Sequence, residues 1–280
     1  MAEKIGNGLQ YVPKLHLNKS QCSFPRFKIL KTKNHYLRCL FQNMSDSIVI
    51  IPTYNEKENI EKMIRQVLSY PKDFHILIID DNSPDGTASI VKHLQTEFPE
   101  RLHLEERSGK LGLGTAYIHG FKWSLSKAYD YIFEMDCDFS HNPDDLIRLY
   151  DACKTQGADF SIGSRYCSGG KVKNWPLNRI LMSYFASVYV RMILFIGIKD
   201  TTAGFKCYHR RVLQKIKFEN IKFKGYAFQI CMKYAALNHG FKAKEVPITF
   251  VDRLYGTSKM SAGIFKEAFF GVWKMRQMDL

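Results

Sequence analysis

Hydrophobic residues follow two alternating patterns along residues 47–162. Short continuous runs, typical of buried strands, lie at residues 47–51, 75–80, 102–104, 131–135 and 160–162. Between these runs the apolar positions take helical spacing, as in Ile60, Met63, Ile64, Val67 and Leu68. Similar spacing predicts helices around residues 90–94, at 112–127 and at 143–153. Strands that alternate with helices across short connections predict an α/β fold with a mainly parallel, Rossmann-like sheet flanked by helices.

The second half of the chain is less regular. Its pattern predicts a helix at 180–198, a strand near 205–208, a helix near 225–237, a strand at 243–251 and an amphipathic end. Residues 180–198 are long enough to span a bilayer, but Arg191 lies in the middle of the segment, which favours a buried or interfacial helix. The apolar residues of 264–278 fit either a helix in a membrane interface or one that caps the sheet.

Acidic and polar residues follow three of the predicted strands. They are residues 52–56, Asp80-Asp81 and Asp136-Cys137-Asp138, and they are expected at one rim of the sheet, where such folds bind ligands. Two carboxylates two residues apart suit a divalent cation, Mg²⁺ or Mn²⁺, although a solvated turn has the same pattern. Asp80 and Asp81 fit either ribose hydroxyls or an Asx-turn. His141 is interpreted as a turn residue.

Charge divides the chain into three parts. The total is +14, from 41 basic and 27 acidic residues; residues 1–43 carry +7, residues 44–164 carry −8 and residues 165–280 carry +15. An acidic segment at the predicted binding rim argues against a nucleic-acid partner. It favours a cation site in the acidic half, beside a basic half that faces anions. The alternative is that surface charge varies along the chain without a function. Residues 1–43 show no periodicity and are expected to be a disordered basic extension.

Two further patterns limit the chemistry. Seven scattered cysteines without a C-x-x-C pair favour a reducing, cytoplasmic compartment. The glycines of residues 109–114 match neither a P-loop nor a dinucleotide fingerprint, and indicate a helix entrance instead.

Several motifs together carry a family resemblance. They are PTYNE (52–56), DDNSPDGT (80–87), KLGLGTAYIHG (110–120), MDCDFSHNP (135–143), GSRY (163–166), DTTAGFKCYHR (200–210), GYAFQ (225–229) and VPITFVDRLYGTSK (246–259). In this order they resemble dolichol- or polyprenol-phosphate mannosyltransferases, which are family 2 inverting glycosyltransferases of the GT-A fold. The resemblance implies a single catalytic domain over residues 44–260, followed by an amphipathic segment at 261–280.

The resemblance also implies roles for individual residues. The guanosine pocket of GDP-mannose would be lined by Pro52, Tyr54, Glu56, Ile79 and Asp81. The metal and diphosphate would be held by Asp136, the backbone of Cys137 and Asp138, with Ser140 at the position where some members carry a further ligand. The lipid phosphate would be received by Arg165, Arg179 and Ser183, and the donor diphosphate would be gripped by Arg253 and Lys259. Asp138 and Arg165 are the catalytic candidates.

The activity implied by the resemblance is transfer of mannose from GDP-mannose to dolichyl or polyprenyl phosphate, with inversion. The enzyme would lie at the cytoplasmic face of a membrane, docked on the bilayer or on small membrane subunits. The alternatives are a UDP-glucose-dependent dolichyl-phosphate glucosyltransferase, another family 2 glycosyltransferase, or a catalytically silent partner.

Overall fold

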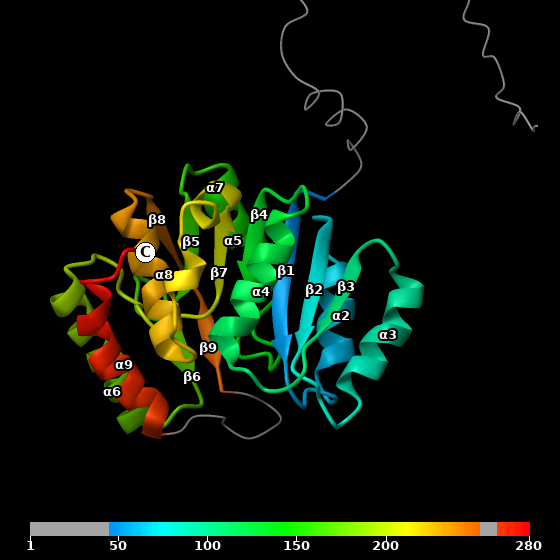
Figure 1. The fold of residues 1–280 in the computed structure, drawn as a ribbon, viewed down its shortest axis with the longest axis horizontal. Coiled ribbons are helices and arrows are strands. Elements are labelled where there is room, and N and C mark those ends of the chain that lie inside the picture. The colour runs from blue at the N-terminus through cyan, green and yellow to red at the C-terminus, as the bar shows by residue number, and fades with distance from the viewer. Residues whose placement is uncertain (1–44, 253–261) are drawn as a thin grey trace, which may run out of the picture. The chain divides into compact units, whose positions relative to one another are not determined.

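The computed structural model describes residues 45–252 and 262–280. The predicted extension at 1–43, Arg253 and Lys259 lie outside this range. The elements (Figure 1) follow in the order β1 (Ser47–Thr53), α2 (Ile60–Leu68), β2 (Phe74–Asp80), α3 (Thr87–Glu97), β3 (Leu102–Glu106), α4 (Leu113–Leu125), β4 (Tyr131–Glu134), α5 (Asp145–Lys154), β5 (Phe160–Ser164), β6 (Lys171–Lys173), α6 (Leu177–Leu194), β7 (Lys206–His209), α7 (Arg210–Leu213), η1 (Phe218–Asn220), α8 (Tyr226–Asn238), β8 (Ala243–Pro247), β9 (Thr249–Val251) and α9 (Ala262–Met275).

The main sheet has seven strands in the order β3-β2-β1-β4-β7-β5-β8. Only β7 is antiparallel to its neighbours, so the expected α/β fold with a mainly parallel sheet is confirmed. The register pairs Thr53 with Asp80, which places the loops after β1 and β2 side by side. Because β7 runs the other way, the residues that precede it reach the same rim as the residues that follow β4 and β5.

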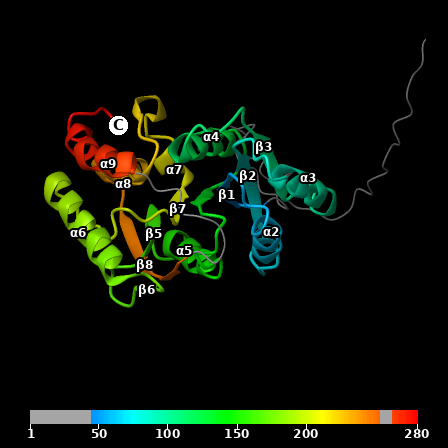
Figure 2. The ribbon, with the colours of Figure 1, turned by 90° about the horizontal axis from the view of Figure 1, so that it is seen from below.

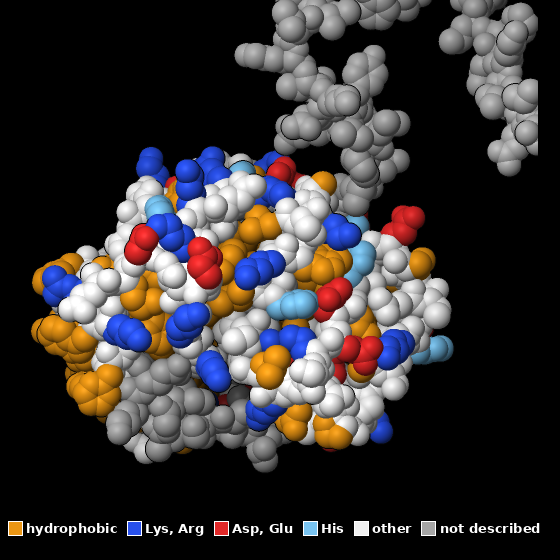
Figure 3. Space-filling model, viewed as in Figure 1, with side chains coloured by type: hydrophobic (Ala, Val, Ile, Leu, Met, Phe, Trp, Pro, Cys, Tyr) orange, Lys and Arg blue, Asp and Glu red, His pale blue; other side chains and the backbone are white. Residues whose placement is uncertain are grey.

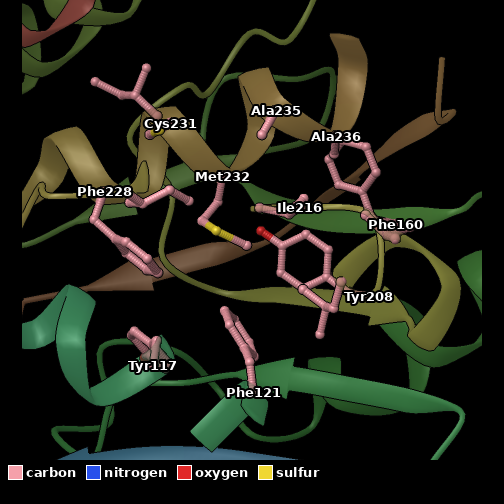
Figure 4. Close-up of a cluster of buried hydrophobic side chains, with 14 of the residues drawn as sticks. Tyr117, Phe121, Phe160, Tyr208, Ile216, Phe228, Cys231, Met232, Ala235 and Ala236 are labelled. Atoms are coloured by element: carbon pink, nitrogen blue, oxygen red, sulfur yellow. The ribbon is translucent and has the colours of Figure 1, made fainter. Parts of the chain in front are cut away.

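Helices cover both faces of this sheet (Figure 2). Alternation along β1 sends Ile48 and Ile50 into one hydrophobic cluster and Val49 and Ile51 into the other, as expected for a strand buried on both faces. The first cluster is capped by α4 and α8, and the second by α2, α3 and α5. Figure 4 shows the first cluster, in which the aromatic rings of α4 and α8 point toward the sheet.

Glycine brings α4 close to the sheet. A Cβ atom on Gly120 would lie 2.7 Å from Cγ2 of Ile50, closer than side-chain carbons approach one another. The close approach lets Tyr117, on the same helix, stack on Phe228 of α8 with ring centroids 6.0 Å apart. Gly112 is the N-cap residue of α4, so the glycine-rich segment before this helix is a helix entrance, as its sequence indicated.

The second half of the chain departs from the sequence prediction. Residues 243–251 form two strands: β8 joins the main sheet, whereas β9 pairs with β6 in a separate two-stranded sheet. The pattern did not predict β6 because its three residues are mostly exposed and contain only one hydrophobic side chain. The helix expected at 180–198 is α6, which begins and ends earlier. No helix among residues 45–252 and 262–280 is long and apolar enough to cross a bilayer.

Candidate active site

A cavity of about 370 Å³ opens at the carboxyl-end rim of the sheet. Its lining combines two groups of residues with opposite charge. The first group, here called the acidic wall, follows β1, β2 and β4 and comprises Glu56, Asp81, Asp136 and Asp138. The second group, the basic wall, follows β5 and continues into α6 and β9; it comprises Arg165, Trp175, Arg179 and Phe250. The structure thus brings most of the predicted site residues into one cavity.

Asp136 is oriented by two aromatic residues. The Tyr117 hydroxyl donates a hydrogen bond to Asp136 Oδ1 over 3.3 Å, and the Asp136 amide donates to His141 Nδ1 over 3.3 Å. Burial, followed by the nearby acidic groups, raises the pKa of Tyr117 well above its usual value, so the hydroxyl keeps its proton. His141 is buried and stacks on Phe205. His141 therefore lies in a turn, as expected, and also supports the Asp-x-Asp segment.

Asp138 is held by its own turn. Its Oδ1 accepts a hydrogen bond of 3.1 Å from the amide of Ser140, and both residues are buried in the cavity lining. Phe139 between them has φ of 59°, in the left-handed region that costs a non-glycine residue about 1 kcal/mol. This conformation lets the chain fold back on the Asp138 carboxylate. Such outliers gather at functional sites because the surrounding structure holds them in place.

Asp80 and Asp81 have separate tasks. Asp80 accepts hydrogen bonds from Thr53 Oγ1, from the Ser83 amide and from Ser83 Oγ, which is the Asx-turn that its sequence allowed. Asp81 reaches the cavity and accepts from Arg107 Nε over 2.6 Å. Only the second carboxylate is therefore placed to meet a ligand.

The outer end of the acidic wall has an aromatic ring beside a cation. Pro52, Tyr54 and Glu56 line the cavity, and Lys110 Nζ lies 4.7 Å from the centroid of the Tyr54 ring. Ile79 does not share this position. It is 0% exposed and packs in the hydrophobic cluster under α4, because alternation along β2 turns its side chain onto that face. The Ile79 side chain therefore does not line the cavity, and its contact with the nucleoside stays a prediction.

Arg165 is the centre of the basic wall. Its Nε and Nη2 donate to the two carboxylate oxygens of Asp200, each over 2.7 Å, and Nη2 also donates to Thr202 Oγ1. Asp200 is 0% exposed; burial acts to raise its pKa, but Arg165 outweighs burial and holds the pKa below its usual value. The bidentate pair fixes the guanidinium at the cavity surface.

Trp175 lies between two guanidinium groups. The Cζ of Arg179 is 3.9 Å from the ring centroid, and that of Arg165 is 5.6 Å away. Arg179 also donates to Asp252 Oδ1 over 3.1 Å. The third predicted phosphate residue, Ser183, is half-buried on α6 and does not line the cavity. Trp175 had no signal in the sequence, because its partners come from other segments.

A buried polar cluster supports the floor of the cavity. Lys206 Nζ lies 3.0 Å from Glu134 Oε1 and also donates to Gln229 Oε1. Lys233 Nζ donates to the carbonyl oxygens of Thr201, Ala203 and Gln229. Burial lowers the pKa of both lysines and raises the pKa of Glu134, against the opposing effect of Lys206. Of these residues, Ala203 and Gln229 line the cavity. The sequence analysis did not single out Gln229, although this residue ends the GYAFQ motif.

The donor set suits a hard divalent cation that is shared with a ligand. Within the described ranges no three His, Cys, Asp or Glu side chains gather around a common metal position. Asp136, Asp138 and Ser140 nevertheless line one cavity and supply only oxygen. Mg²⁺ is usually held by one or two carboxylates together with water and substrate phosphates, so this set fits such an ion.

Solved structures support the fold. Glucosyl-3-phosphoglycerate synthase from Mycobacterium tuberculosis, in complex with Mn²⁺, UDP and phosphoglyceric acid, matches with a TM-score of 0.60 at 14% identity, over 90% of this chain and 84% of that one. The same enzyme with Mg²⁺ and UDP also gives 0.60, at 13% identity, over 91% of this chain and 87% of that one. At such identities the likeness concerns the fold alone, and it confirms the expected GT-A architecture.

Sequence relatives are much closer. Polyprenol monophosphomannose synthase of Mycolicibacterium smegmatis is 47% identical over 232 residues, which cover 82% of this chain and 87% of the relative. Undecaprenyl-phosphate mannosyltransferase of Micrococcus luteus is 43% identical over 225 residues, covering 80% and 91%. The family model described as glycosyl transferase family 2 matches residues 48–217, from β1 to the segment after α7. The chain therefore belongs to glycosyl transferase family 2.

Proposed function

We propose that the protein transfers mannose from GDP-mannose to the phosphate of a polyprenol or dolichol, with inversion at the anomeric carbon. The observation that carries the proposal is the single cavity with an acidic wall and a basic wall, which suits a nucleotide-bound cation on one side and an anionic acceptor on the other. The mannosyltransferase names of relatives at 47% and 43% identity support the sugar and the acceptor class.

Each wall has a distinct task in this reaction. The donor nucleoside would lie against Pro52, Tyr54, Glu56 and Asp81, and its diphosphate beside Asp136 and Asp138. These two carboxylates, with Ser140 beside them, would hold Mg²⁺ or Mn²⁺. The bound ion neutralises charge on the leaving diphosphate. Arg253 and Lys259, which lie outside the described residues, are proposed to contact the same diphosphate.

The basic wall would position the nucleophile. A phosphate monoester is mostly dianionic at pH 7, so its oxygen needs no general base. Arg165 and Arg179 would bind this phosphate and direct one oxygen at the anomeric carbon, opposite the bond to the diphosphate. The new C–O bond forms as the bond to the diphosphate breaks, and the electron pair leaves with GDP. One displacement of this kind gives a β-linked mannosyl phosphate.

The apolar helices beside the basic wall are proposed to rest on a membrane. Of the twelve large hydrophobic side chains that are exposed among the described residues, ten lie on α6, on its C-cap residue Phe195, or on α9. Figure 3 shows hydrophobic side chains gathered at this edge of the molecule. The two helices pack together, with Tyr189 stacked on Phe269 at 4.7 Å. We name this exposed surface the α6–α9 face.

A bilayer is the occupant that fits the α6–α9 face best. Arg179, in the first turn of α6, lines the cavity, so the same helix connects the acceptor site to the apolar surface. The excess of positive charge in residues 165–280 complements anionic lipid headgroups. Flotation of the pure protein with anionic vesicles tests the proposal; failure to float would favour docking on membrane subunits.

One experiment tests the reaction itself. Pure protein is incubated with Mg²⁺ or Mn²⁺, polyprenyl phosphates of several lengths, and either labelled GDP-mannose or labelled UDP-glucose. We expect label from GDP-mannose in the lipid phase, and its loss when EDTA removes the cation. Transfer from UDP-glucose alone would overturn the donor assignment, and transfer from neither would overturn the proposed reaction.

A further inference from the structure

Gln229 lies at the floor of the cavity, beside the Asp-x-Asp segment. It belongs to the first turn of α8 and is 2% exposed, yet it forms part of the cavity lining. A Cβ atom placed on Gly204 would be 3.6 Å from Gln229 Nε2, 3.6 Å from His141 Cε1 and 3.8 Å from Asp136 Oδ2. The amide nitrogen and the Asp136 carboxylate therefore face the same corner of the cavity.

Lys206 fixes the orientation of this amide. The two ends of a Gln side chain look alike in most structures, so their assignment must come from hydrogen-bonding partners. Lys206 is fully buried and its ammonium offers only donors, so the group it contacts in Gln229 must be the carbonyl oxygen. The NH₂ end is then the end that faces Gly204 and the cavity.

The NH₂ end of Gln229 is not fully satisfied in the part of the chain that the structure describes. No hydrogen bond of good geometry reaches Gln229 Nε2 from these residues. Glu134 is the neighbouring acceptor on the inner side, but an amide carries two N–H hydrogens, and one still faces the cavity. A buried donor left unsatisfied costs about 1–3 kcal/mol, and a ligand oxygen at this corner would remove that cost.

We propose that Gln229 donates a hydrogen bond to a hydroxyl oxygen of the transferred sugar and thereby selects the sugar. This inference rests on the proposed glycosyl transfer but is independent of which nucleotide carries the sugar. The cavity already offers cationic groups for phosphates, namely Lys110, Arg165, Arg179 and Lys224. A neutral amide next to Asp136 suits the neutral part of the donor that lies next to the diphosphate, which is the sugar ring.

The physical reason for selectivity is the fixed donor. Because Lys206 prevents the amide from rotating to offer its oxygen, the site discriminates against a sugar that lacks the matching hydroxyl. Loss of that hydroxyl leaves one N–H of the amide without an acceptor. Removing either the hydroxyl or the amide hydrogen is therefore expected to have the same effect, and removing both should add little.

The test pairs Gln229 variants with deoxy sugars. Gln229→Glu keeps an acceptor for Lys206 and nearly the same shape, but its carboxylate lacks the N–H. It also adds a negative charge to a cluster that contains two lysines and one glutamate, so it is expected to fold. Gln214→Glu, on an exposed residue at the end of α7, is the matched control. For each protein, kcat/KM is measured with GDP-mannose and with its 2-, 3-, 4- and 6-deoxy analogues, and the melting temperature is recorded.

The expected result is an effect confined to one hydroxyl. In the unmodified protein one deoxy analogue should lose about 10- to 100-fold in kcat/KM, and Gln229→Glu should abolish most of that difference while lowering kcat/KM for GDP-mannose by a similar factor. Gln229→Met is predicted to behave alike and replaces Gln229→Glu if the added carboxylate prevents folding. Equal losses for every analogue in the variants, or an unchanged pattern, would overturn the inference.

Failure of the proposed function gives a different result. If the unmodified protein uses UDP-glucose and not GDP-mannose, the donor assignment is wrong, and the same comparison with deoxy analogues of UDP-glucose then tests Gln229. If Gln229→Glu keeps the same selectivity among the deoxy analogues of UDP-glucose, the proposed role of Gln229 is wrong, whereas glycosyl transfer itself is not affected.

Discussion

The two walls of the cavity are stabilised in different ways. On the acidic wall, the Asp138 carboxylate is held by an amide two residues away, and the neighbouring Asp80 by a serine three residues away. On the basic wall, Arg165 is held by Asp200, 35 residues away, and Arg179 by Asp252, 73 residues away. Local turns thus shape part of the first wall, where Asp136 and Asp81 also have distant partners in Tyr117 and Arg107. Long-range ion pairs hold both arginines of the second wall. A change on the acidic wall should therefore affect chemistry, and one on the basic wall should also affect folding.

The largest effect is expected from Asp136→Asn. The amide keeps the shape of the side chain and can still accept from Tyr117, but it removes the negative charge that is proposed to hold the cation. We expect kcat to fall on the order of 10³-fold, with a melting temperature close to that of the unmodified protein. Steady-state kinetics across a Mg²⁺ titration, together with calorimetric titration of Mn²⁺, measure both consequences.

Asp151→Asn is the matched control for this change. Asp151 lies on α5, outside the cavity lining, and is expected to keep full activity. Near-normal kcat of Asp136→Asn at saturating Mg²⁺ would show that the acidic wall does not hold the cation.

The opposite behaviour is expected of Asp200→Asn on the basic wall. This change leaves the Arg165 charge buried without its counter-ion, which should lower the free energy of unfolding by about 3 kcal/mol. Because the pKa of Asp200 is lowered in the folded state, its contribution to stability is complete above the unfolded-state pKa of about 3.9 and is lost as the pH falls through the lower folded-state value. The Asp200→Asn variant should not show this loss of stability at acidic pH.

Urea denaturation of both proteins at pH 7 and below pH 4 measures this prediction. The difference between the unmodified protein and Asp200→Asn should be largest at pH 7 and shrink in acid. A constant difference across that range would mean that the Asp200 charge does not stabilise the basic wall.

The same contrast explains how far the sequence could be interpreted. Asp138 and the Ser140 amide that holds it lie two residues apart, so the Asp-x-Asp cluster was visible as a motif. The Tyr117 hydroxyl that orients Asp136 comes from 19 residues away and was not visible. Asp200, Trp175 and Gln229 act through partners in distant segments, and a single sequence does not show which segments meet. Arg165 was identified, but the carboxylate that fixes its guanidinium was not.

The direction of a strand and the direction of its side chains were harder to predict from the sequence, for a related reason. The apolar runs predicted β1, β2, β4 and β5 because both faces of these strands are buried. The run near Phe205 predicted β7, but hydrophobicity does not record that β7 is antiparallel. The side chain of Ile79 is turned away from the cavity by the alternation along β2, a direction that the family resemblance does not show.

A moderate effect is expected on the α6–α9 face, next to the basic wall. Phe185 and Met192 are 62% and 67% exposed, so replacing each by Ser should leave folding intact. Loss of one apolar side chain should weaken partitioning onto vesicles about 10-fold. Activity on vesicle-bound polyprenyl phosphate should fall in parallel, while activity on a short-chain, water-soluble acceptor should stay the same. Equal losses on both acceptors would place these residues in the acceptor site instead of the membrane contact.

The smallest effect is expected from Phe195→Gly, which should change folding stability and membrane binding in opposite directions. Phe195, the C-cap of α6, is 80% exposed and has φ of 54°, a left-handed conformation that glycine adopts without strain. Phe195→Gly should therefore raise the free energy of unfolding by about 0.5–1 kcal/mol, after loss of the contact between the ring and Arg276. The same change should weaken vesicle binding, because it removes an apolar group from the α6–α9 face.

Opposite signs in the two measurements are the informative outcome. A large phenylalanine that costs stability and faces solvent is explained if the bilayer covers it, since burial of its ring then offsets the backbone strain. Phe195→Ala is the matched control, because it removes the ring but keeps most of the left-handed strain, and should weaken vesicle binding without the gain in stability. If Phe195→Gly gains stability and binds vesicles as well as the unmodified protein does, the C-cap of α6 lies outside the membrane contact, and the contact must then be confined to the middle of α6 and to α9.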